Sequence, residues 1–336
     1  MFLDVLPLQN NTVRLCRVYG DEPSVTLPDA LPAPDGTPWA ITELGDYCFS
    51  EKPRNLPAPE QLLRYEVHED GTVELLTEKA DLHPVCGNFV EEISLPESLR
   101  VVGSCAFYNC RKLRRLSVGS GELIVGSDVF LNCFALETIL VRATPEQPTG
   151  LFALVNSITE AVEALYQPKD TAAPLAGLWY PAYWEDIEES PAHILLHTFS
   201  GQGYHYRQCF LNQKFLPAEY DAIFPQGHAS EDANIIAMLC FDRLRWPWQL
   251  SEAAKTAYRE FVAANTGRIL TRLLKAQDLE GVKTLLAMDV MTPEAFAEGA
   301  ALAAKADNAS AAALLADAEY KKRAAQPRKK RYDFDF

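Results

Sequence analysis

Histidine side chains that suit a metal site lie close together in one central stretch of the chain. His193 and His197 are four residues apart, and His205 follows eight residues later. On a helix, the four-residue spacing places two imidazoles on one face, where they can bind zinc. The segment around them, HILLHTF, has strand character and lacks the glutamate of an HExxH motif. We therefore expect no metal ion and no cofactor.

A cysteine in the same stretch raises the question of nucleophilic catalysis. Cys209 lies four residues after His205, and Asp221 follows. A cysteine activated by a histidine base can act as a nucleophile, and such a pair would make this region a small hydrolase or transferase. The alternative is a packed cysteine beside surface histidines, because catalytic groups meet through the fold and not through local spacing. We favour packing and assign no catalytic residue.

The elements around these residues are predicted from periodicity and turn signals. Residues 155–166 show apolar side chains on one helical face, and 216–224 and 233–244 also read as helices. HILLHTF and YHYRQCFL are predicted to pair as a hairpin around SGQG, where Gly201 and Gly203 suit a turn better than a phosphate loop. A nearby aromatic cluster is predicted to be core or a docking surface between domains, with a binding groove as the alternative; its members are Trp179, Tyr180, Tyr183 and Trp184.

The clearest organisation is a repeat of 23 residues between positions 90 and 142. Ile93, Leu116 and Ile139 are separated by this interval. The same interval separates five further pairs, namely Gly103 and Gly126, Phe107 and Phe130, Asn109 and Asn132, Cys110 and Cys133, and Leu113 and Leu136. A degenerate earlier copy matches Val25, Leu27 and Pro28 to the strand, and Gly45 and Phe49 to the turn. Several independent positions that share one period indicate stacked coils.

One repeat reads as a short strand followed by a turn and an apolar back wall. Ile93 and Leu95 alternate with polar residues and point inward, and Pro96 ends the strand. Gly103 is expected to permit a tight turn. A single coil cannot bury its apolar face, so stacking should place Phe107 over Phe130 and Cys110 over Cys133. We expect these two cysteines to pack as thiols, although neighbouring coils are close enough for a disulfide.

The repeats resemble the BspA-type leucine-rich repeat family. The resemblance rests on three segments of about residues 20–143, namely ELGDYCF (43–49), ISLPESLRVVGSCAFYNCRKLRRLSV (93–118) and GSDVFLNCFALETILV (126–141). It implies a solenoid and a binding role at a cell surface or outside the cell. Residues 52–89 do not follow the pattern and are expected to form a distorted coil or an insert, with DGTVELL as a turn and a strand.

The outward strand positions of the repeats are the candidate partner-binding residues. They are Glu92, Ser94, Arg115, Ser117, Thr138 and Leu140. Concave solenoid faces commonly bind proteins, so we expect a protein partner here, with a plain solvated sheet face as the alternative.

Beyond residue 250 the chain becomes rich in alanine and helical. Ser251, Asp278, Thr292 and Asn308 each stand where a helix N-cap is expected. These short helices weakly resemble ankyrin-like or other helical-hairpin repeats, and a plain helical bundle is the alternative.

Residues 321–336 differ from the rest of the chain. They contain seven basic and two acidic side chains and end in alternating Tyr332, Phe334 and Phe336. Alternation places the three aromatic rings on one side of an extended chain, as in a peptide that adds to a sheet edge. We expect this tail to dock a partner, with a disordered solubilising tail as the alternative.

Composition fits this organisation. The chain has 336 residues and a net charge of −15, so nucleic acid is an improbable partner except at the basic tail. No signal peptide or membrane span is recognised, and eight cysteines without a CxxC pair suit a reducing compartment. We expect a cytoplasmic location, with the cell surface as the alternative.

The predicted fold class is α+β. A short leucine-rich-repeat solenoid (1–143) is followed by a mixed α/β connecting domain (144–250), an α-helical hairpin-repeat module (251–320) and the tail (321–336). The function expected is a non-enzymatic protein–protein interaction scaffold. A Cys/His-dependent enzyme and a cell-surface binding protein or adhesin are the alternatives.

Overall fold

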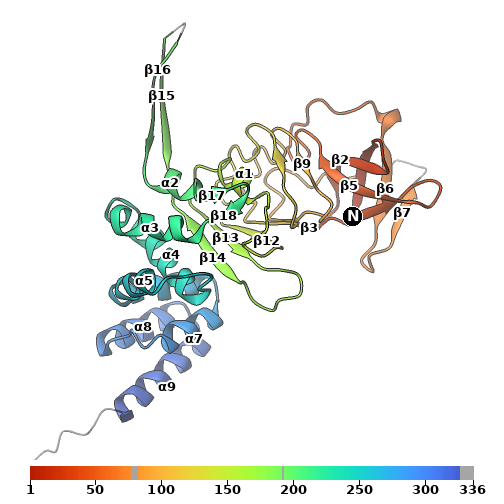
Figure 1. Ribbon diagram of the computed structural model, residues 1–336. Coiled ribbons are helices and arrows are strands. Elements are labelled where there is room, and N and C mark those ends of the chain that lie inside the picture. Colours follow the sequence, from red (N-terminus) through yellow and green to blue (C-terminus); the bar gives the residue numbers. More distant parts are fainter. Residues whose placement is uncertain (77–81, 191–192, 326–336) are drawn as a thin grey trace, which may run out of the picture. The chain divides into compact units, whose positions relative to one another are not determined.

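The computed structural model describes residues 1–76, 82–190 and 193–325, and the side chains of these residues apart from 187–197 and 325. The chain forms two compact units, Met1–Glu231 and Asp232–Phe336. The division between them falls inside the stretch 144–250, which the sequence suggested as one connecting domain. The fold is α+β, with a solenoid in the first unit and helices in the second (Figure 1).

The first unit contains a sheet built from the repeats. Its strands, in spatial order, are β3 (Ser24–Thr26), β8 (Glu92–Ser94), β10 (Arg115–Val118), β12 (Thr138–Val141), β13 (Val162–Tyr166) and β14 (Ala176–Tyr180). All neighbours are parallel except β13 and β14. Ile93, Leu116 and Ile139 are direct partners in register and are buried, which confirms the predicted stacking of the coils.

The degenerate early copy is a true coil of the same stack. Val25 pairs in register with Ile93. The ring of Phe49 stacks on Phe107 at 5.5 Å, and Phe107 stacks on Phe130 at 5.3 Å. Because aromatic rings bury large areas, this column fills the interior of the coils. The expected alignment of Phe107 with Phe130 is confirmed.

Cysteine and asparagine repeat positions also link successive coils. Cys110 and Cys133 are free thiols, and the Sγ of Cys133 donates to the carbonyl oxygen of Phe107 at 3.0 Å. Nδ2 of Asn132 donates to Oδ1 of Asn109 at 2.7 Å. Both asparagines adopt left-handed backbone conformations, which asparagine tolerates better than most residues. The prediction that the cysteines pack without a disulfide is confirmed.

Gly103 is required for a different reason from the one that the sequence suggested. Its φ does not fall in the left-handed region. A Cβ at this position would instead lie 2.6 Å from the backbone of Gly45 and Asp46 in the preceding coil. The glycine therefore permits close backbone stacking and not an unusual turn.

A second sheet runs along the other side of the coils and continues into the N-terminal strands. Its order is β11 (Ile124–Val125), β9 (Val101–Val102), β5 (Pro38–Leu44), β2 (Thr12–Tyr19), β1 (Phe2–Pro7), β6 (Leu63–Val67) and β7 (Val73–Leu76), with β4 (Ala30–Pro32) paired to β5. A short 3-10 helix, η1 (Pro59–Gln61), precedes β6. β7 is the strand predicted in DGTVELL, but β6 and β7 extend this sheet and do not form a distorted coil.

The helix predicted for residues 155–166 is wrong. Helix α1 covers Leu151–Val155, and β13 takes residues 162–166 as the next parallel rung beside β12. Within β13, Val162, Ala164 and Tyr166 are buried and alternate with half-buried residues, which is strand periodicity. Over so short a run, the apolar spacing fits both a helix and a strand. The segment forms a strand because β12 offers it backbone hydrogen-bond partners.

The predicted hairpin is wrong: HILLHTF is a strand, as expected, but it does not pair with YHYRQCFL. β15 (Trp184–Ser190) pairs with β16 (His193–Ser200), and this hairpin extends away from the neighbouring elements of its unit (Figure 1). YHYR forms helix α2 (Gly203–Arg207) instead of the expected second strand. A Cβ on Gly203 would meet the carbonyl oxygen of Pro181 at 2.1 Å, so close packing decides this position.

The rest of the first unit consists of short elements over the end of the solenoid. They are β17 (Phe210–Leu211), β18 (Lys214–Phe215), α3 (Pro217–Gly227) and η2 (His228–Ser230). Trp179, Tyr180 and Tyr183 are buried, whereas Trp184 is 66% exposed. The aromatic cluster is thus mostly core, as predicted.

The second unit is helical. Its helices are α4 (Ala233–Arg245), α5 (Glu252–Ala264), α6 (Thr266–Lys275), α7 (Leu279–Ala287), α8 (Pro293–Lys305) and α9 (Ala309–Ala325). The predicted N-caps are confirmed, because Ser251, Asp278, Thr292 and Asn308 each accept a hydrogen bond from a backbone N–H three residues later. Within the described residues, no helix combines the length and the apolar character needed to cross a membrane.

Candidate functional site

The candidate partner-binding residues lie on the outer face of the repeat sheet in two rows that cross its strands. Glu92, Arg115 and Thr138 are direct neighbours in one row, which β13 extends with Glu163. Ser94, Ser117 and Leu140 form the second row, which β13 extends with Leu165. Parallel pairing fixes both rows, because equivalent residues of successive coils face the same side.

The first row contains two exposed charged side chains. Glu92 and Arg115 are exposed and stand opposite each other on adjacent strands. Thr138 is half-buried, and its hydroxyl donates to Oε2 of Glu163 at 3.0 Å. The row therefore presents an acid, a base, a hydroxyl and a second acid across four neighbouring strands.

The second row is partly occupied by an arginine that the sequence analysis did not select. Nη1 of Arg142 donates to the hydroxyls of Ser94 at 3.1 Å and Ser117 at 2.5 Å. Ser117 is only 8% exposed. The structure thus gives Ser94 and Ser117 an internal partner, while Leu140 stays half-buried beside them.

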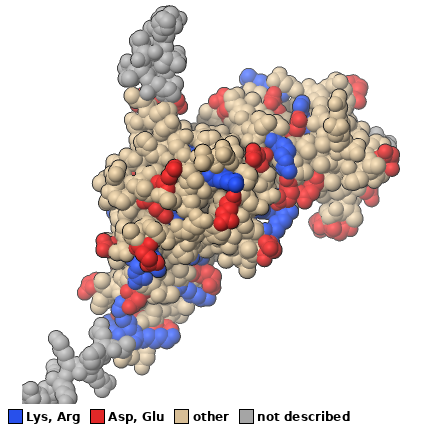
Figure 2. Space-filling model, viewed as in Figure 1, with Lys and Arg blue, Asp and Glu red and all other residues tan. Residues whose placement is uncertain are grey.

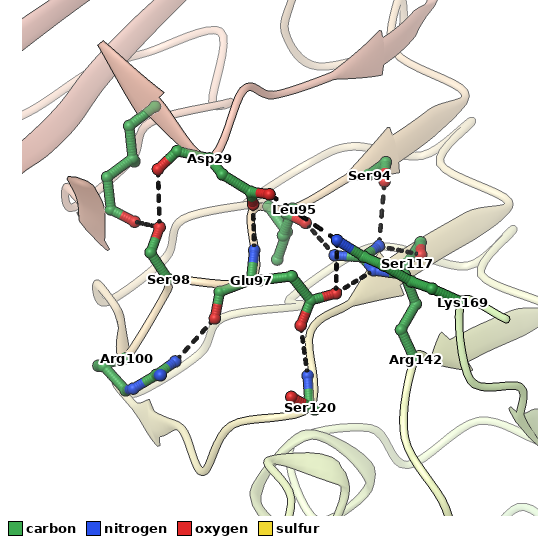
Figure 3. Close-up of polar contacts among 11 residues, drawn as sticks. Asp29, Ser94, Leu95, Glu97, Ser98, Arg100, Ser117, Ser120, Arg142 and Lys169 are labelled. Carbon is green, nitrogen blue, oxygen red and sulfur yellow. Dashed lines mark hydrogen bonds and ion pairs between the residues drawn. The ribbon is translucent and has the colours of Figure 1, made fainter. Parts of the chain in front are cut away.

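Arg142 also holds the carboxyl ends of the strands together. Its Nε donates to Oε1 of Glu97 at 2.6 Å, and Nη2 donates to the carbonyl oxygen of Leu95 (Figure 3). Glu97 in turn accepts a hydrogen bond from the backbone N–H of Ser120 at 2.9 Å. One guanidinium therefore connects residues of three successive coils.

A more exposed pair borders this cluster. Nζ of Lys169 lies 3.4 Å from Oε1 of Glu97 and 3.7 Å from Oδ2 of Asp29. Oδ1 of Asp29 accepts the backbone N–H of Glu97 at 2.6 Å. We call Asp29, Glu97, Arg142 and Lys169 the clamp.

The clamp lowers the pKa of Glu97. Partial burial by itself raises the pKa of this carboxyl, but the hydrogen bonds from Arg142 and the Ser120 N–H and the charges of Arg142 and Lys169 outweigh it. Glu97 is therefore an ionised partner for Arg142 at neutral pH.

The repeat register contains a signal for this cluster. Arg142 occupies the position that Gly119 has one coil earlier and Pro96 two coils earlier. A Cβ on Gly119 would lie 2.9 Å from Cα of Glu97, so only glycine leaves room there. When one repeat position holds a glycine in one coil and a long basic residue in the next, the basic side chain has room to reach back across the earlier coils.

The residues considered for catalysis do not form a catalytic pair. The Cys209 side chain is buried, and its Sγ donates to the carbonyl oxygen of His205 at 3.5 Å, not to a ring nitrogen. Burial raises the pKa of the Cys209 thiol to about 12. A thiol with that pKa supplies almost no thiolate at neutral pH, so it is a poor nucleophile.

A metal site is not formed within the described part of the chain. No group of three or more histidine, cysteine, aspartate or glutamate side chains there is arranged to hold a metal ion. The side chains of His193 and His197 lie outside the described residues.

The deeply buried Arg207 in this region is structural. It donates to the carbonyl oxygens of Val155 at 2.9 Å, Gly203 at 2.8 Å and Glu160 at 2.7 Å. Burial lowers the pKa of Arg207 to about 10, which still leaves it charged at neutral pH. It joins α1, α2 and the loop that precedes β13.

The outer face of the repeat sheet therefore presents charged, hydroxyl and apolar side chains at fixed positions on neighbouring strands. Figure 2 shows basic and acidic side chains interspersed over the visible surface instead of gathered by sign. A surface on which both signs are interspersed lacks the single positive field that a polyanion requires.

The comparisons with known proteins agree with this geometry. Residues 86–162 match a family model described as BspA type leucine rich repeat region (6 copies). These residues belong to the BspA-type leucine-rich repeat family. The matched repeats include β8, β10 and β12, whose outward residues form the two rows. The match ends before the second unit, so it does not address the weak ankyrin-like resemblance.

The other two comparisons add little. One solved structure, a leucine rich cell surface protein from Faecalibacterium prausnitzii A2-165, is 15% identical over 42% of this chain, with a TM-score of 0.27. The alignment spans 31% of that protein. The search of curated proteins found no match.

Proposed function

We propose that this chain is a non-enzymatic scaffold that binds a protein partner through the outer face of the BspA-type repeats. The observation that carries the proposal is the exposed pair Glu92 and Arg115, fixed opposite each other on adjacent strands. Parallel rungs hold these charges at a constant spacing, which reduces the conformational entropy lost on binding. Leucine-rich repeats support such a role because proteins of this class generally bind proteins through solenoid surfaces.

The clamp strengthens this proposal without itself being the contact. Arg142 and Glu97 are mostly buried, with side-chain exposures of 13% and 24%. Arg142 bonds the hydroxyls of Ser94 on β8 and Ser117 on β10 and so links these strands beside the exposed row. Charged side chains held on a rigid sheet favour a partner whose own charges match their positions, and not one that responds only to net charge.

The test is quantitative affinity capture from cells of the source organism with full-length protein. Arg115→Glu should remove the proteins that the wild type captures, because it places two acids beside each other. Lys112→Glu is the matched control, since Lys112 is exposed in the same coil but outside the outer strand positions. Equal loss in both variants, or no loss in either, contradicts a binding site on this face.

The compartment is a separate part of the proposal. All eight cysteines are free, and most are buried, which suits a reducing cytoplasm. Cell fractionation decides between this location and the cell surface. The tail residues Tyr332, Phe334 and Phe336 lie outside the described residues, and their role in docking remains a prediction.

A further inference from the structure

The backs of the coils are joined by a second ladder of hydrogen bonds. The N–H of Phe49 donates to the carbonyl oxygen of Ala106 at 2.8 Å. One coil later, the N–H groups of Cys105, Phe107 and Asn109 donate to the carbonyl oxygens of Ser127, Val129 and Leu131 at 2.9, 3.1 and 3.0 Å. Each coil therefore directs alternate N–H groups toward the coil that follows it.

This ladder stops at the last complete turn. Asp128, Phe130 and Asn132 stand one repeat after Cys105, Phe107 and Asn109. Among the described residues, no hydrogen bond is made by the backbone N–H groups of these three residues. We call Asp128, Phe130 and Asn132 the open edge.

The open edge exists because a helix replaces the next turn. Leu151, one repeat after Asp128, begins α1, whose carbonyl oxygens are used within the helix and its ends. The carbonyl oxygens of a helix accept hydrogen bonds from its own N–H groups, so α1 cannot continue this ladder. Three backbone N–H donors in turn conformation, at alternate residues, are thereby left at the end of the stack.

A cavity and an apolar rim lie along this edge. The cavity has a volume of about 230 Å³ and is lined by residues 128–136 on one side and 157–160 on the other. Leu131 and Phe134 at the rim are 47% and 65% exposed. The exposed carboxyls of Asp128 and Glu160 also face it. An occupant must supply carbonyl oxygens at alternate residues, apolar side chains and positive charge.

Residues 326–336 of this chain have that chemistry. Arg328, Lys329, Lys330 and Arg331 form a basic run directly before Tyr332, Phe334 and Phe336. In an extended chain, the carbonyl groups of alternate residues point to the same side, so one face of the segment can offer acceptors to donors at alternate residues. The remainder of the chain, residues 1–325, carries a net charge of −17, so this basic segment attracts another copy.

We propose that residues 326–336 of one copy add as an extended strand to the open edge of a second copy. The contact is head-to-tail, so it uses two different surfaces of the same chain. It is separate from the outer face of the repeats and stands whether or not that face binds a partner.

The test uses sedimentation velocity of the full chain over a range of concentrations. Wild-type protein should associate as its concentration rises, and less so at high salt, because the basic run faces Asp128 and Glu160. A tail variant, Phe334→Ser with Phe336→Ser, should stay monomeric. An edge variant, Leu131→Ser with Phe134→Ser, should also stay monomeric, whereas Ile124→Ser, at a residue that is 71% exposed elsewhere, should associate like the wild type.

Mixing the two monomeric variants gives the sharpest result. The edge variant keeps an intact tail and the tail variant keeps an intact edge, so an equimolar mixture should form a one-to-one dimer. Hydrogen exchange of the 128–132 amides should slow about tenfold in that mixture. Association that survives both variants, a mixture that stays monomeric, or protection that does not depend on concentration overturns the proposal.

Discussion

The ring of Phe107 lies 5.3 Å from the ring of Phe130, with their planes only 9° apart. Phe49 stacks on the opposite face of Phe107, so a single aromatic column runs through three coils. Phe49 and Phe107 are fully buried, and Phe130 is 6% exposed. Equivalent phenylalanines of successive coils therefore pack directly on one another.

Removal of the central ring should destabilise the first unit strongly. Phe107→Ala is expected to lower the free energy of unfolding by about 3–5 kcal/mol, because it leaves a cavity between two rings. Chemical denaturation of the full chain measures the change. Phe134→Ala is the matched control: its side chain is 65% exposed, so the expected change is within about 0.5 kcal/mol. Similar small changes in both variants would show that the column does not carry the core.

A methyl group at Gly103 should force the coils apart. Its Cβ would lie 2.6 Å from backbone atoms of the preceding coil, which cannot move aside as a flexible side chain can. Gly103→Ala is expected to cost about 1–3 kcal/mol, the range for overpacked cores. Thermal unfolding tests this, with Ser120→Ala at an exposed site as the control. An alanine that leaves the melting temperature unchanged would contradict the close stacking.

Acid should weaken the clamp. The pKa of Glu97 is lower in the folded protein than in the unfolded chain, so its contribution is complete above the unfolded pKa of about 4.3. The contribution is lost as the pH falls from that value through the lower folded pKa, because the unfolded state then binds the proton more readily.

Glu97→Gln tests this pH dependence. It should lower the free energy of unfolding by about 1–2 kcal/mol at neutral pH, a value reduced for partial solvent exposure. Urea titrations at a series of pH values should show the difference between variant and wild type shrinking in acid. A difference that is constant with pH would mean that the charge of Glu97 does not contribute.

The thiols should differ sharply in reactivity. Burial raises the pKa of Cys16 to about 11 and those of Cys133 and Cys209 to about 12. Cys105 is more accessible than these buried cysteines. Brief treatment of the native protein with iodoacetamide, followed by peptide mass spectrometry, should therefore label Cys105 first, because thiolate and access both govern the rate. Rapid labelling of Cys209 would instead support the nucleophile that was considered for an enzyme.

Loss of the N-cap of α7 should destabilise the second unit. Asp278 accepts the backbone N–H of Gly281 at 2.8 Å and a hydrogen bond from Nη2 of Arg245 at 3.1 Å. Asp278→Ala removes both interactions and is expected to cost about 1–2 kcal/mol. Asp278→Asn retains a capping oxygen and should cost less. Denaturation followed by circular dichroism distinguishes the two, and equal losses would assign the effect to the charge alone.

Sequence reasoning succeeded where interactions repeat at short range. The alignment of Ile93, Leu116 and Ile139 follows from one 23-residue period, because each coil contacts only its neighbours. The N-caps of the second unit were also predictable, since a capping side chain bonds to a backbone group three residues away.

It failed where a segment had two possible partners. Residues 162–166 fit a helix by their apolar spacing, but the edge of β12 recruits them as a strand. β16 was predicted correctly as a strand, yet it pairs with the segment before it, because the segment after it folds as α2. In a run of only a few residues, the apolar spacing is compatible with both a helix and a strand. The hydrogen-bond partner that the fold provides then decides which one forms.

By itself, the sequence determined the coil, its period and the residues on each face, because those properties arise from local alternation and nearest-neighbour stacking. Only the tertiary structure decided that Arg142 reaches back to Glu97 and that α1 leaves the N–H groups of Asp128, Phe130 and Asn132 without acceptors in the described chain. Both outcomes depend on which segment packs against the last coil. That segment either supplies hydrogen-bond partners to the coil or leaves its backbone groups without them.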